Sequence, residues 1–160
     1  MSALCRNFWH VFGVDISRPT LDECRRQLNR CGCSNFETVC MDAACPCQVL
    51  EGVGRDTVDL FFSVAVFQHF PSKAYTKEVL DVAVDLMCKG GHGLVQVRYF
   101  DGSEKLRQKE GDYAKNVIYM TSFTTGEFST LLAETGFTLL GSKQGLDDPE
   151  DRHEYFFFRK

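Results

Sequence analysis

The carboxylate of Asp15 is the side chain of this sequence whose position most clearly suggests chemistry. It follows the short apolar run 11–14, and a helix is expected right after it, with Ser17 as N-cap and Pro19 in the first turn. Open α/β sheets hold the ribose of a nucleotide with an acid at the carboxyl end of a buried strand. The alternative is an acid that is simply stabilised by the dipole of the following helix.

A glycine-rich phosphate turn is missing from the segment where it is expected. In nucleotide-binding halves this turn precedes the acid by about 20 residues. Only fourteen residues precede Asp15, and they contain no such turn. The sequence therefore has the acid but not the glycine-rich turn that usually precedes it.

Composition and charge narrow the class of protein. The 160 residues are 44% hydrophobic and 25% charged, which predicts one soluble globular domain over 1–160. The net charge of −4 argues against a nucleic-acid partner. The longest apolar run, 60–67, is too short to span a bilayer, and the first residues do not form a signal peptide. We therefore expect a cytoplasmic protein that is not attached to a membrane.

Eight cysteines allow disulfides, a metal site or free thiols, and five of them lie between Cys31 and Cys47. A reducing compartment makes disulfides the least expected outcome. Zinc sites pair thiols with a wider spacing than the Cys-x-Cys found at Cys31/Cys33 and Cys45/Cys47. Free thiols without a metal are the favoured interpretation, with Cys40 among them, and oxidation of the Cys45/Cys47 loop is a practical risk.

Strands and helices alternate through the first two thirds of the chain. Strands are expected at 11–16, 36–41, 58–66 and 94–99, and helices between Ser17 and Gly32 and over 72–87. The strand at 58–66 is nearly continuous apolar, as expected for burial on both faces. Gly90 and Gly91 are the expected left-handed C-cap of the second helix. Residues 43–56 predict a loop with at most one short helical turn.

The last third changes character. Residues 102–120 are polar and predict a connection or cap segment, after which Thr124 or Thr125 can begin a helix that Gly136 ends. Strands at 137–140 and 155–158 follow, joined by an acidic loop. A short connection between neighbouring strands favours an antiparallel pair.

Six segments in this order resemble the class I methyltransferases that use S-adenosylmethionine. The resemblance covers about nine tenths of the chain and implies an α/β, three-layer Rossmann-like sheet, mostly parallel with an antiparallel C-terminal strand. The segments are Val11-Phe-Gly-Val-Asp15-Ile-Ser, Val39-Cys-Met-Asp42-Ala, Val58-Asp-Leu-Phe-Phe-Ser-Val-Ala-Val-Phe-Gln-His69-Phe, Leu86-Met-Cys-Lys-Gly-Gly91-His-Gly-Leu-Val, Phe123-Thr-Thr-Gly-Glu-Phe-Ser-Thr-Leu-Leu-Ala-Glu-Thr-Gly136-Phe and Tyr155-Phe-Phe-Phe-Arg-Lys.

The resemblance implies a role for several residues in binding S-adenosylmethionine. Asp15 would accept hydrogen bonds from the ribose hydroxyls, with Ile16 beside the adenine ring. Asp42 would accept the adenine amino group and Ala43 would offer its backbone amide, although an ordinary loop aspartate fits Asp42 almost as well. Ser63 and Val64 would face the methionine part of the cofactor.

The acceptor side would follow the same central strand. Imidazoles titrate near neutral pH, so His69 is the one candidate for acid–base catalysis, with a structural helix-capping role as the alternative. The other residues assigned to the substrate side are Phe67, Gln68, Arg98 and Tyr99, with Tyr119 as a further aromatic candidate. The acceptor itself is expected to be a small molecule.

The chain departs from the family in lacking the first strand, and residues 1–10 resemble only the end of the helix after it. That strand normally lies between the Asp15 strand and the 58–66 strand, so its loss leaves two unpaired edges. The two strands could pair directly, a second copy or another partner could supply pairing, or the chain is a fragment that needs an upstream segment. Direct pairing and dimerisation are the favoured outcomes.

Two functional classes remain open, since cofactor affinity is expected to fall without the glycine-rich turn. The first is a methyltransferase, either weak alone or completed by a partner. The second is a non-catalytic binding or interaction module that keeps the fold. A nicotinamide-dependent Rossmann enzyme fits less well, because the antiparallel C-terminal pair favours the methyltransferase arrangement.

Overall fold

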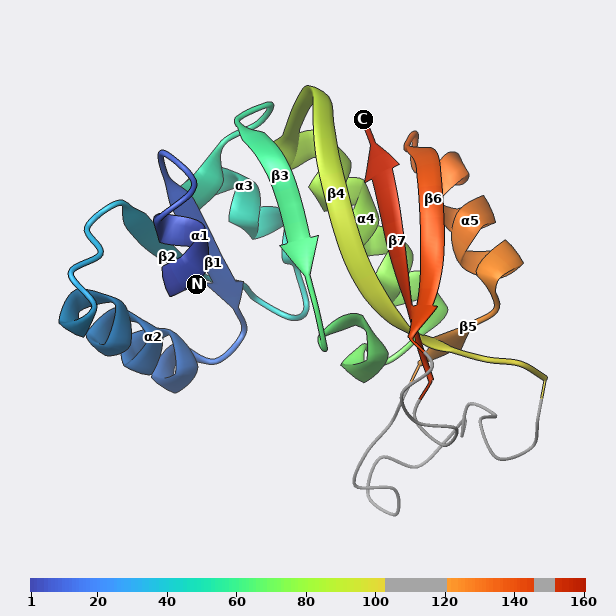
Figure 1. Ribbon diagram of the computed structural model, residues 1–160, viewed down its shortest axis with the longest axis horizontal. Coiled ribbons are helices and arrows are strands. Elements are labelled where there is room, and N and C mark those ends of the chain that lie inside the picture. Colours follow the sequence, from blue (N-terminus) through green and yellow to red (C-terminus); the bar gives the residue numbers. More distant parts are fainter. Residues whose placement is uncertain (103–120, 146–151) are drawn as a thin grey trace, which may run out of the picture. The chain divides into compact units, whose positions relative to one another are not determined.

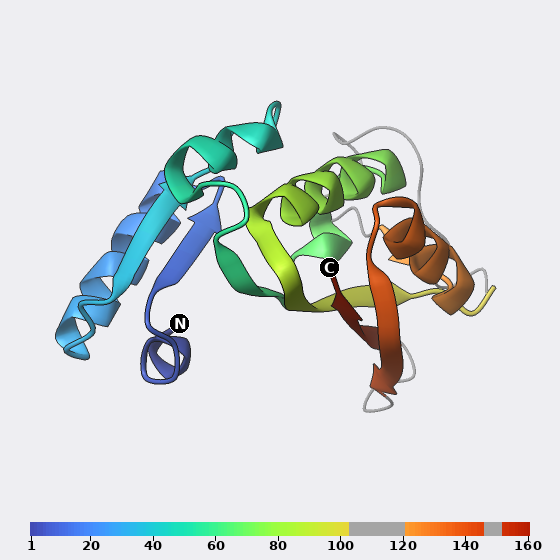
Figure 2. The same ribbon diagram turned by 90° about the horizontal axis from the view of Figure 1, so that it is seen from above.

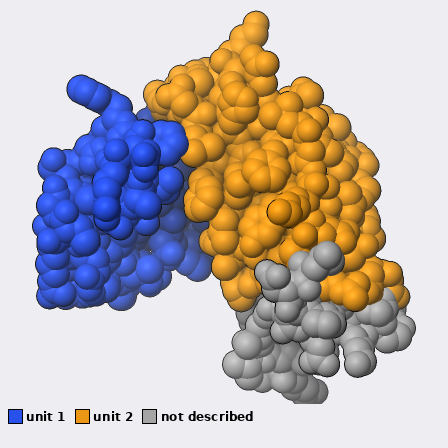
Figure 3. All heavy atoms as spheres, in the orientation of Figure 1, with its two compact units in different colours: residues 1–54 blue, residues 55–160 orange. Residues whose placement is uncertain are grey.

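The computed structural model describes residues 1–102, 121–145 and 152–160, so the expected connection at 102–120 lies, except for Gly102, outside the described residues, as does Tyr119. The chain forms two compact units, 1–54 and 55–160 (Figure 3). The expectation of one domain over 1–160 stays a prediction. Unit 1 contains α1 (Ser2–Cys5), β1 (Val11–Asp15), α2 (Arg18–Arg30), β2 (Phe36–Cys40), the 3-10 turn η1 (Pro46–Gln48) and α3 (Val49–Val53).

Unit 2 contains the larger share of the described helices and strands (Figure 1). Its elements are β3 (Val58–Ser63), the 3-10 turn η2 (Phe67–His69), α4 (Lys73–Leu86), β4 (Met87–Tyr99), β5 (Ser122–Phe123), α5 (Thr125–Glu134), β6 (Thr138–Gly145) and β7 (His153–Arg159). None of the helices in the described part of the chain is long and apolar enough to cross a membrane.

Unit 1 is built on a pair of parallel strands with α2 packed beside it (Figures 1 and 2). The helix begins where the sequence predicts, because the Ser17 hydroxyl accepts the Thr20 N–H at 3.3 Å. Its apolar side buries Leu28, which packs with Cys5 and Val11. This small core packs at the amino ends of β1 and β2, where it includes Val11 and Phe36.

Unit 2 is a five-stranded sheet in the order β3-β4-β7-β6, with β5 beside the end of β4. The strand β4 is parallel to β3 and β5 and antiparallel to β7. The strands β6 and β7 form the expected antiparallel pair. The fold is therefore the predicted α/β methyltransferase-like arrangement, mostly parallel with antiparallel C-terminal strands.

The core of unit 2 lies between its sheet and the helices α4 and α5, which are behind the sheet in Figure 1. Phe128 of α5 is at its centre and fully buried. Its ring centroid is 4.6 Å from that of Phe156, 5.1 Å from Phe123 and 6.3 Å from Phe67. These aromatic contacts attach the helix to the sheet and to η2.

The helix α5 begins with a capping box. The Thr124 hydroxyl accepts the Glu127 N–H at 3.2 Å, and the Glu127 carboxylate accepts the Thr124 N–H at 2.8 Å. Gly136, with a φ of +93°, follows the end of the helix as predicted.

The expectation that Gly90 and Gly91 cap a helix is wrong. The helix α4 ends at Leu86 and β4 begins at once, so both glycines lie inside a strand. The backbone of this segment pairs with Lys160: Gly90 donates to its carbonyl at 2.9 Å, and Lys160 donates to Gly91 at 3.0 Å. The positive φ of Gly90, +86°, coincides with a register shift against β3, as in a β-bulge.

The expectation that 58–66 is buried on both faces is also wrong. The strand β3 ends at Ser63, and the side chains of Phe62, Val64 and Val66 are 51%, 37% and 46% exposed. An apolar run predicts burial only where other elements cover both faces of the strand.

Within unit 1, β1 pairs with β2, and within unit 2, β3 pairs with β4. The two favoured expectations for the edges beside the expected first strand, direct pairing of its neighbours and dimerisation, both stay predictions, as does a partner that supplies the pairing.

Candidate functional site

Asp15 occupies the last position of β1, as predicted, and its carboxylate is fixed by the turn that leads into α2. Its Oδ1 accepts the Ser17 backbone N–H at 2.8 Å, and the side chain is half-buried. The next residue, Ile16, is 57% exposed. An anchored carboxylate next to an exposed aliphatic side chain can accept hydroxyl donors while a flat apolar group packs alongside.

Asp42 follows the end of β2 and is held in a similar way. Its Oδ1 accepts the Ala44 N–H at 2.8 Å, while its backbone carbonyl accepts the Cys45 N–H at 3.0 Å. This is the geometry of an ordinary Asx turn, so the loop-aspartate alternative describes the turn well. Asp42 and Ala43 are both exposed and accessible to a ligand.

The parallel register brings the two acids to the same edge of the β1–β2 pair. Asp15 is paired with Cys40, and the Met41 N–H donates to the Asp15 carbonyl at 3.0 Å, so Asp42 is the next residue along. Ligands of open α/β sheets bind outside the carboxyl ends of the strands. The sequence predicted an acid after each of these two strands, and the structure has them there. Their role in binding a cofactor stays a prediction.

In unit 2 the carboxyl end of β3 leads into a strained turn. Ser63 is half-buried and paired with Val95, and Ala65 has a φ of +60°, the left-handed region that disfavours side chains with a Cβ. The Ala65 N–H donates to Oε1 of Gln96 at 2.8 Å. This hydrogen bond stabilises the turn. Val64, which was predicted to face the methionine part of the cofactor, is partly exposed in it.

Gln96 is a structural support of the site that sequence reasoning missed. Its side chain is 6% exposed, on a strand whose neighbours Val95 and Val97 are buried. A polar residue between buried apolar residues of a strand must find a hydrogen-bond partner. The polar Gln96 within the apolar run Leu94-Val-Gln-Val was the signal in the sequence that could have identified this role.

The turn η2 carries three of the residues predicted for the substrate side. Phe67 is 1% exposed and belongs to the core, whereas His69 is exposed. Gln68 is 9% exposed, and its Oε1 is buried with no hydrogen-bond partner among the described residues. Its Nε2 lies 3.3 Å from Nε2 of His69. A buried, unpaired carbonyl oxygen beside an imidazole can receive a donor from a bound molecule.

Arg98 and Tyr99 lie at the end of β4, where they pair with Ser122 and Phe123 of β5. Both side chains are half-buried. Ser63, at the end of β3, pairs with Val95 of β4. Val95 lies three residues before Arg98 along β4. The structure therefore places the predicted unit 2 residues along the carboxyl ends of β3 and β4.

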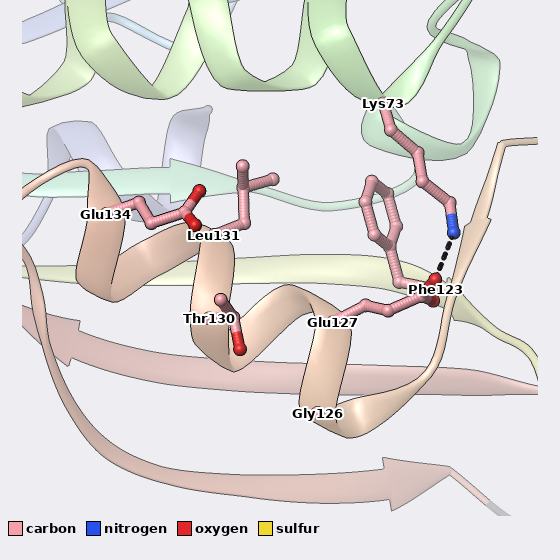
Figure 4. Close-up of a pocket in the computed structure, with 7 residues that line it drawn as sticks. All are labelled: Lys73, Phe123, Gly126, Glu127, Thr130, Leu131 and Glu134. Atoms are coloured by element: carbon pink, nitrogen blue, oxygen red, sulfur yellow. Dashed lines mark hydrogen bonds and ion pairs between the residues drawn. The ribbon is translucent and has the colours of Figure 1, made fainter.

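A cavity of about 340 Å³ lies elsewhere in unit 2, over α5 and the start of α4 (Figure 4). Lys73 and Glu127 form an ion pair of 2.7 Å at its rim, and the Lys73 ammonium is 5.3 Å from the centre of the Phe123 ring. No residue predicted for the site lines it. The contacts at this cavity fix the start of α5.

Within the described ranges, no group of three or more His, Cys, Asp or Glu side chains could hold a metal ion. All eight cysteines are free.

The comparison with known families agrees with this fold. The family model described as a methyltransferase domain matches residues 1–91, and the chain belongs to this family. The resemblance inferred from the sequence is thereby confirmed.

Solved structures of methyltransferases share the fold. The 1,6-didemethyltoxoflavin-N1-methyltransferase of Burkholderia thailandensis, solved with bound 1,6-didemethyltoxoflavin and S-adenosylhomocysteine, is 21% identical with a TM-score of 0.71, over 94% of this chain and 61% of that protein. An S-adenosylmethionine-dependent methyltransferase of Methanosarcina mazei is 12% identical with a TM-score of 0.75, over 99% and 85%.

The N-methyltransferase NodS of Bradyrhizobium japonicum, in complex with S-adenosylhomocysteine, is 14% identical with a TM-score of 0.70, over 99% of this chain and 70% of that protein. At these identities the likeness concerns the fold. The chain spans about three fifths of the length of the Burkholderia enzyme. Among curated proteins, no sequence matches significantly.

Proposed function

We propose that this protein binds S-adenosylmethionine and takes part in methyl transfer to a small-molecule acceptor. The observation that supports the proposal most strongly is the pair of anchored acids at the carboxyl ends of β1 and β2. One oxygen of each carboxylate is bonded within its own turn, so both side chains are held in place before a ligand binds. Pre-ordered groups lose less conformational entropy on binding.

The donor set fits the nucleoside part of this cofactor. The Asp15 carboxylate accepts the two ribose hydroxyls in charge-assisted bonds, and Ile16 packs against the adenine ring. Asp42 accepts the adenine amino group, and the exposed Ala43 offers its backbone N–H. Because these 160 residues contain no glycine-rich turn, they bind the methionyl end more weakly than family members that have this turn.

When bound, the cofactor supplies a methyl group on a positively charged sulfur, which is already a good leaving group. The protein therefore has mainly to hold the acceptor in line. We assign Ser63 and Val64 to the methionine part. The unpaired Oε1 of Gln68 accepts a donor from the acceptor molecule, and His69 removes the proton that the acceptor loses. Arg98 and Tyr99 shape this side, whereas the buried Phe67 supports it from the core.

Calorimetric titration with S-adenosylmethionine tests the proposal. Asp15→Asn keeps the oxygen that accepts the Ser17 N–H but removes the charge, so it should weaken binding by about 10- to 100-fold, as expected for hydrogen bonds to a charged group. Asp22→Asn is the matched control, since Asp22 is an exposed acid of α2 paired with Arg25 at 2.8 Å. No detectable heat with the unmodified protein at millimolar cofactor would contradict cofactor binding by this chain.

The absence of the glycine-rich turn favours one alternative, a non-catalytic module that keeps the methyltransferase fold. The alternative predicts that Asp15→Asn has the same negligible effect as Asp22→Asn. It also predicts that no methyl group is transferred from labelled cofactor to any small acceptor. Binding that is lost with Asp15→Asn, together with transfer of the labelled methyl group by the unmodified protein, supports the enzyme.

A further inference from the structure

The chain contains two Cys-x-Cys segments with the same spacing, but only one brings its sulfurs together. The Sγ atoms of Cys45 and Cys47 are 3.0 Å apart. Cys33 instead packs into the core of unit 1 beside Cys5, and Cys31 is exposed. Burial, and next the neighbouring Cys33 thiol, raise the pKa of Cys5. The Cys31/Cys33 segment is therefore an internal control for the Cys45/Cys47 segment.

The local backbone explains why Cys45 and Cys47 meet. Pro46 between them is buried and fixes its own φ, so the peptide is held in the turn η1. The Cys45 N–H donates to the Asp42 carbonyl at 3.0 Å, and the Cys45 carbonyl accepts the Gln48 N–H at 3.1 Å. The turn thus presents both side chains on one side.

We propose that Cys45 and Cys47 form a dithiol oxidation site that closes to a disulfide. A disulfide has a sulfur–sulfur distance of about 2.05 Å, so the sulfurs have to approach by only about 1 Å. The proposal concerns the thiols alone and does not depend on the proposed function.

The oxidant class is a peroxide, and the reaction proceeds in two balanced steps. The Cys47 thiol loses its proton, the thiolate attacks one peroxide oxygen and the O–O bond breaks, so that Cys47 becomes a sulfenic acid and the leaving hydroxide takes up the proton to give water. The Cys45 sulfur then attacks the Cys47 sulfur, the S–O bond breaks, and a second water leaves with the Cys45 proton. Two thiols and one hydrogen peroxide thus give one disulfide and two waters.

Exposure assigns the order of the two cysteines. Cys47 is exposed and meets the oxidant first, whereas Cys45 is half-buried. The hydrogen bond with Cys47, and after it the burial of its thiol, raise the pKa of Cys45. Cys45 is accordingly the resolving thiol, held in contact with its target before oxidation.

The test treats the full chain with equimolar hydrogen peroxide, blocks remaining thiols with N-ethylmaleimide and maps the modified peptides by mass spectrometry. Trypsin alone leaves all five clustered cysteines in the peptide 31–55, but additional cleavage before Asp42 separates 42–55 from 31–41. We expect an internal disulfide in 42–55 and alkylated thiols in 31–41. Its formation should be about tenfold faster or more than any bridge of Cys31 with Cys33, since the reacting sulfurs are already adjacent.

Three variants sharpen the result. Cys45→Ser should leave Cys47 as a sulfenic acid that dimedone traps, Cys47→Ser should remove the disulfide, and Cys31→Ser should leave the disulfide in 42–55 unchanged. The proposal is overturned if the two Cys-x-Cys peptides oxidise at equal rates. It is overturned equally if no internal disulfide forms in 42–55 while other thiols are oxidised.

Discussion

Truncation of two adjacent phenylalanines on β7 should have very different effects on stability. Successive side chains of a strand point to opposite faces of the sheet. Phe156 is fully buried and contacts the ring of Phe128, whereas its neighbour Phe157 is 42% exposed on the other face. Phe156→Ala and Phe157→Ala are therefore a matched pair with the same change in size.

The magnitudes follow from this difference in burial. Removing a buried phenylalanine ring costs about 3–5 kcal/mol, because apolar contacts are lost and a cavity remains. At Phe157 just over half of the side chain is covered, and solvent can fill the space, so the loss should be about 1–2 kcal/mol. The free energies of unfolding of the two variants should therefore differ by about 1–4 kcal/mol, with Phe156→Ala the less stable.

Urea denaturation followed by far-UV circular dichroism measures these free energies. The only tryptophan, Trp9, is in unit 1 and 96% exposed, so its fluorescence does not follow the unfolding of the five-stranded sheet. The urea dependence should stay unchanged if both variants keep the fold. Equal destabilisation by the two substitutions would refute the assigned register of β7.

Two further predictions concern unit 2. Gly93→Ala should destabilise by about 1–3 kcal/mol, because the added Cβ would overlap the buried Phe158 ring, whereas Gly126→Ala on α5 meets open space and should gain roughly 0.5 kcal/mol; urea titrations compare them. Burial acts to raise the pKa of Glu127, but hydrogen bonds with Lys73 and the helix N-cap outweigh it and keep the pKa below its usual 4.5. The resulting stability is present above pH 4.5 and lost as the pH falls through the lower folded pKa. Solvent screening limits this loss of stability to about 0.5 kcal/mol, and Glu127→Gln should abolish it. An equal loss of stability at low pH in the variant and in the unmodified protein would contradict this prediction.

The sequence was informative where local chemistry decides the structure. Ser17 and Thr124 cap helices because their hydroxyls accept N–H groups a few residues ahead. Asp15 ends its strand as the apolar run before it predicts. These features depend on neighbours in the chain, and so they can be inferred without knowledge of the tertiary fold.

The errors arose where distant segments decide the structure. Gly90 has the type and position of a helix cap, but pairing with Lys160 places it in a strand. Phe62 belongs to an apolar run, but its burial depends on which elements cover β3. The short strand β5 at 122–123 carries no pattern of its own and forms because it pairs with the end of β4.

The position of β7 bears on how the protein folds during its synthesis. The strand β7 lies between β4 and β6 in the sheet, but it comes last of the described strands in the sequence. The ribosome therefore releases β7 only after the other described strands of the sheet have been made. Until then β4 keeps one open edge, and such an edge is prone to pair with another nascent chain. The β1–β2 pair, whose contacts are closer in sequence, can form earlier. Slow translation of the last segment, or loss of it through a premature stop codon, should therefore increase aggregation of unit 2 and leave unit 1 folded.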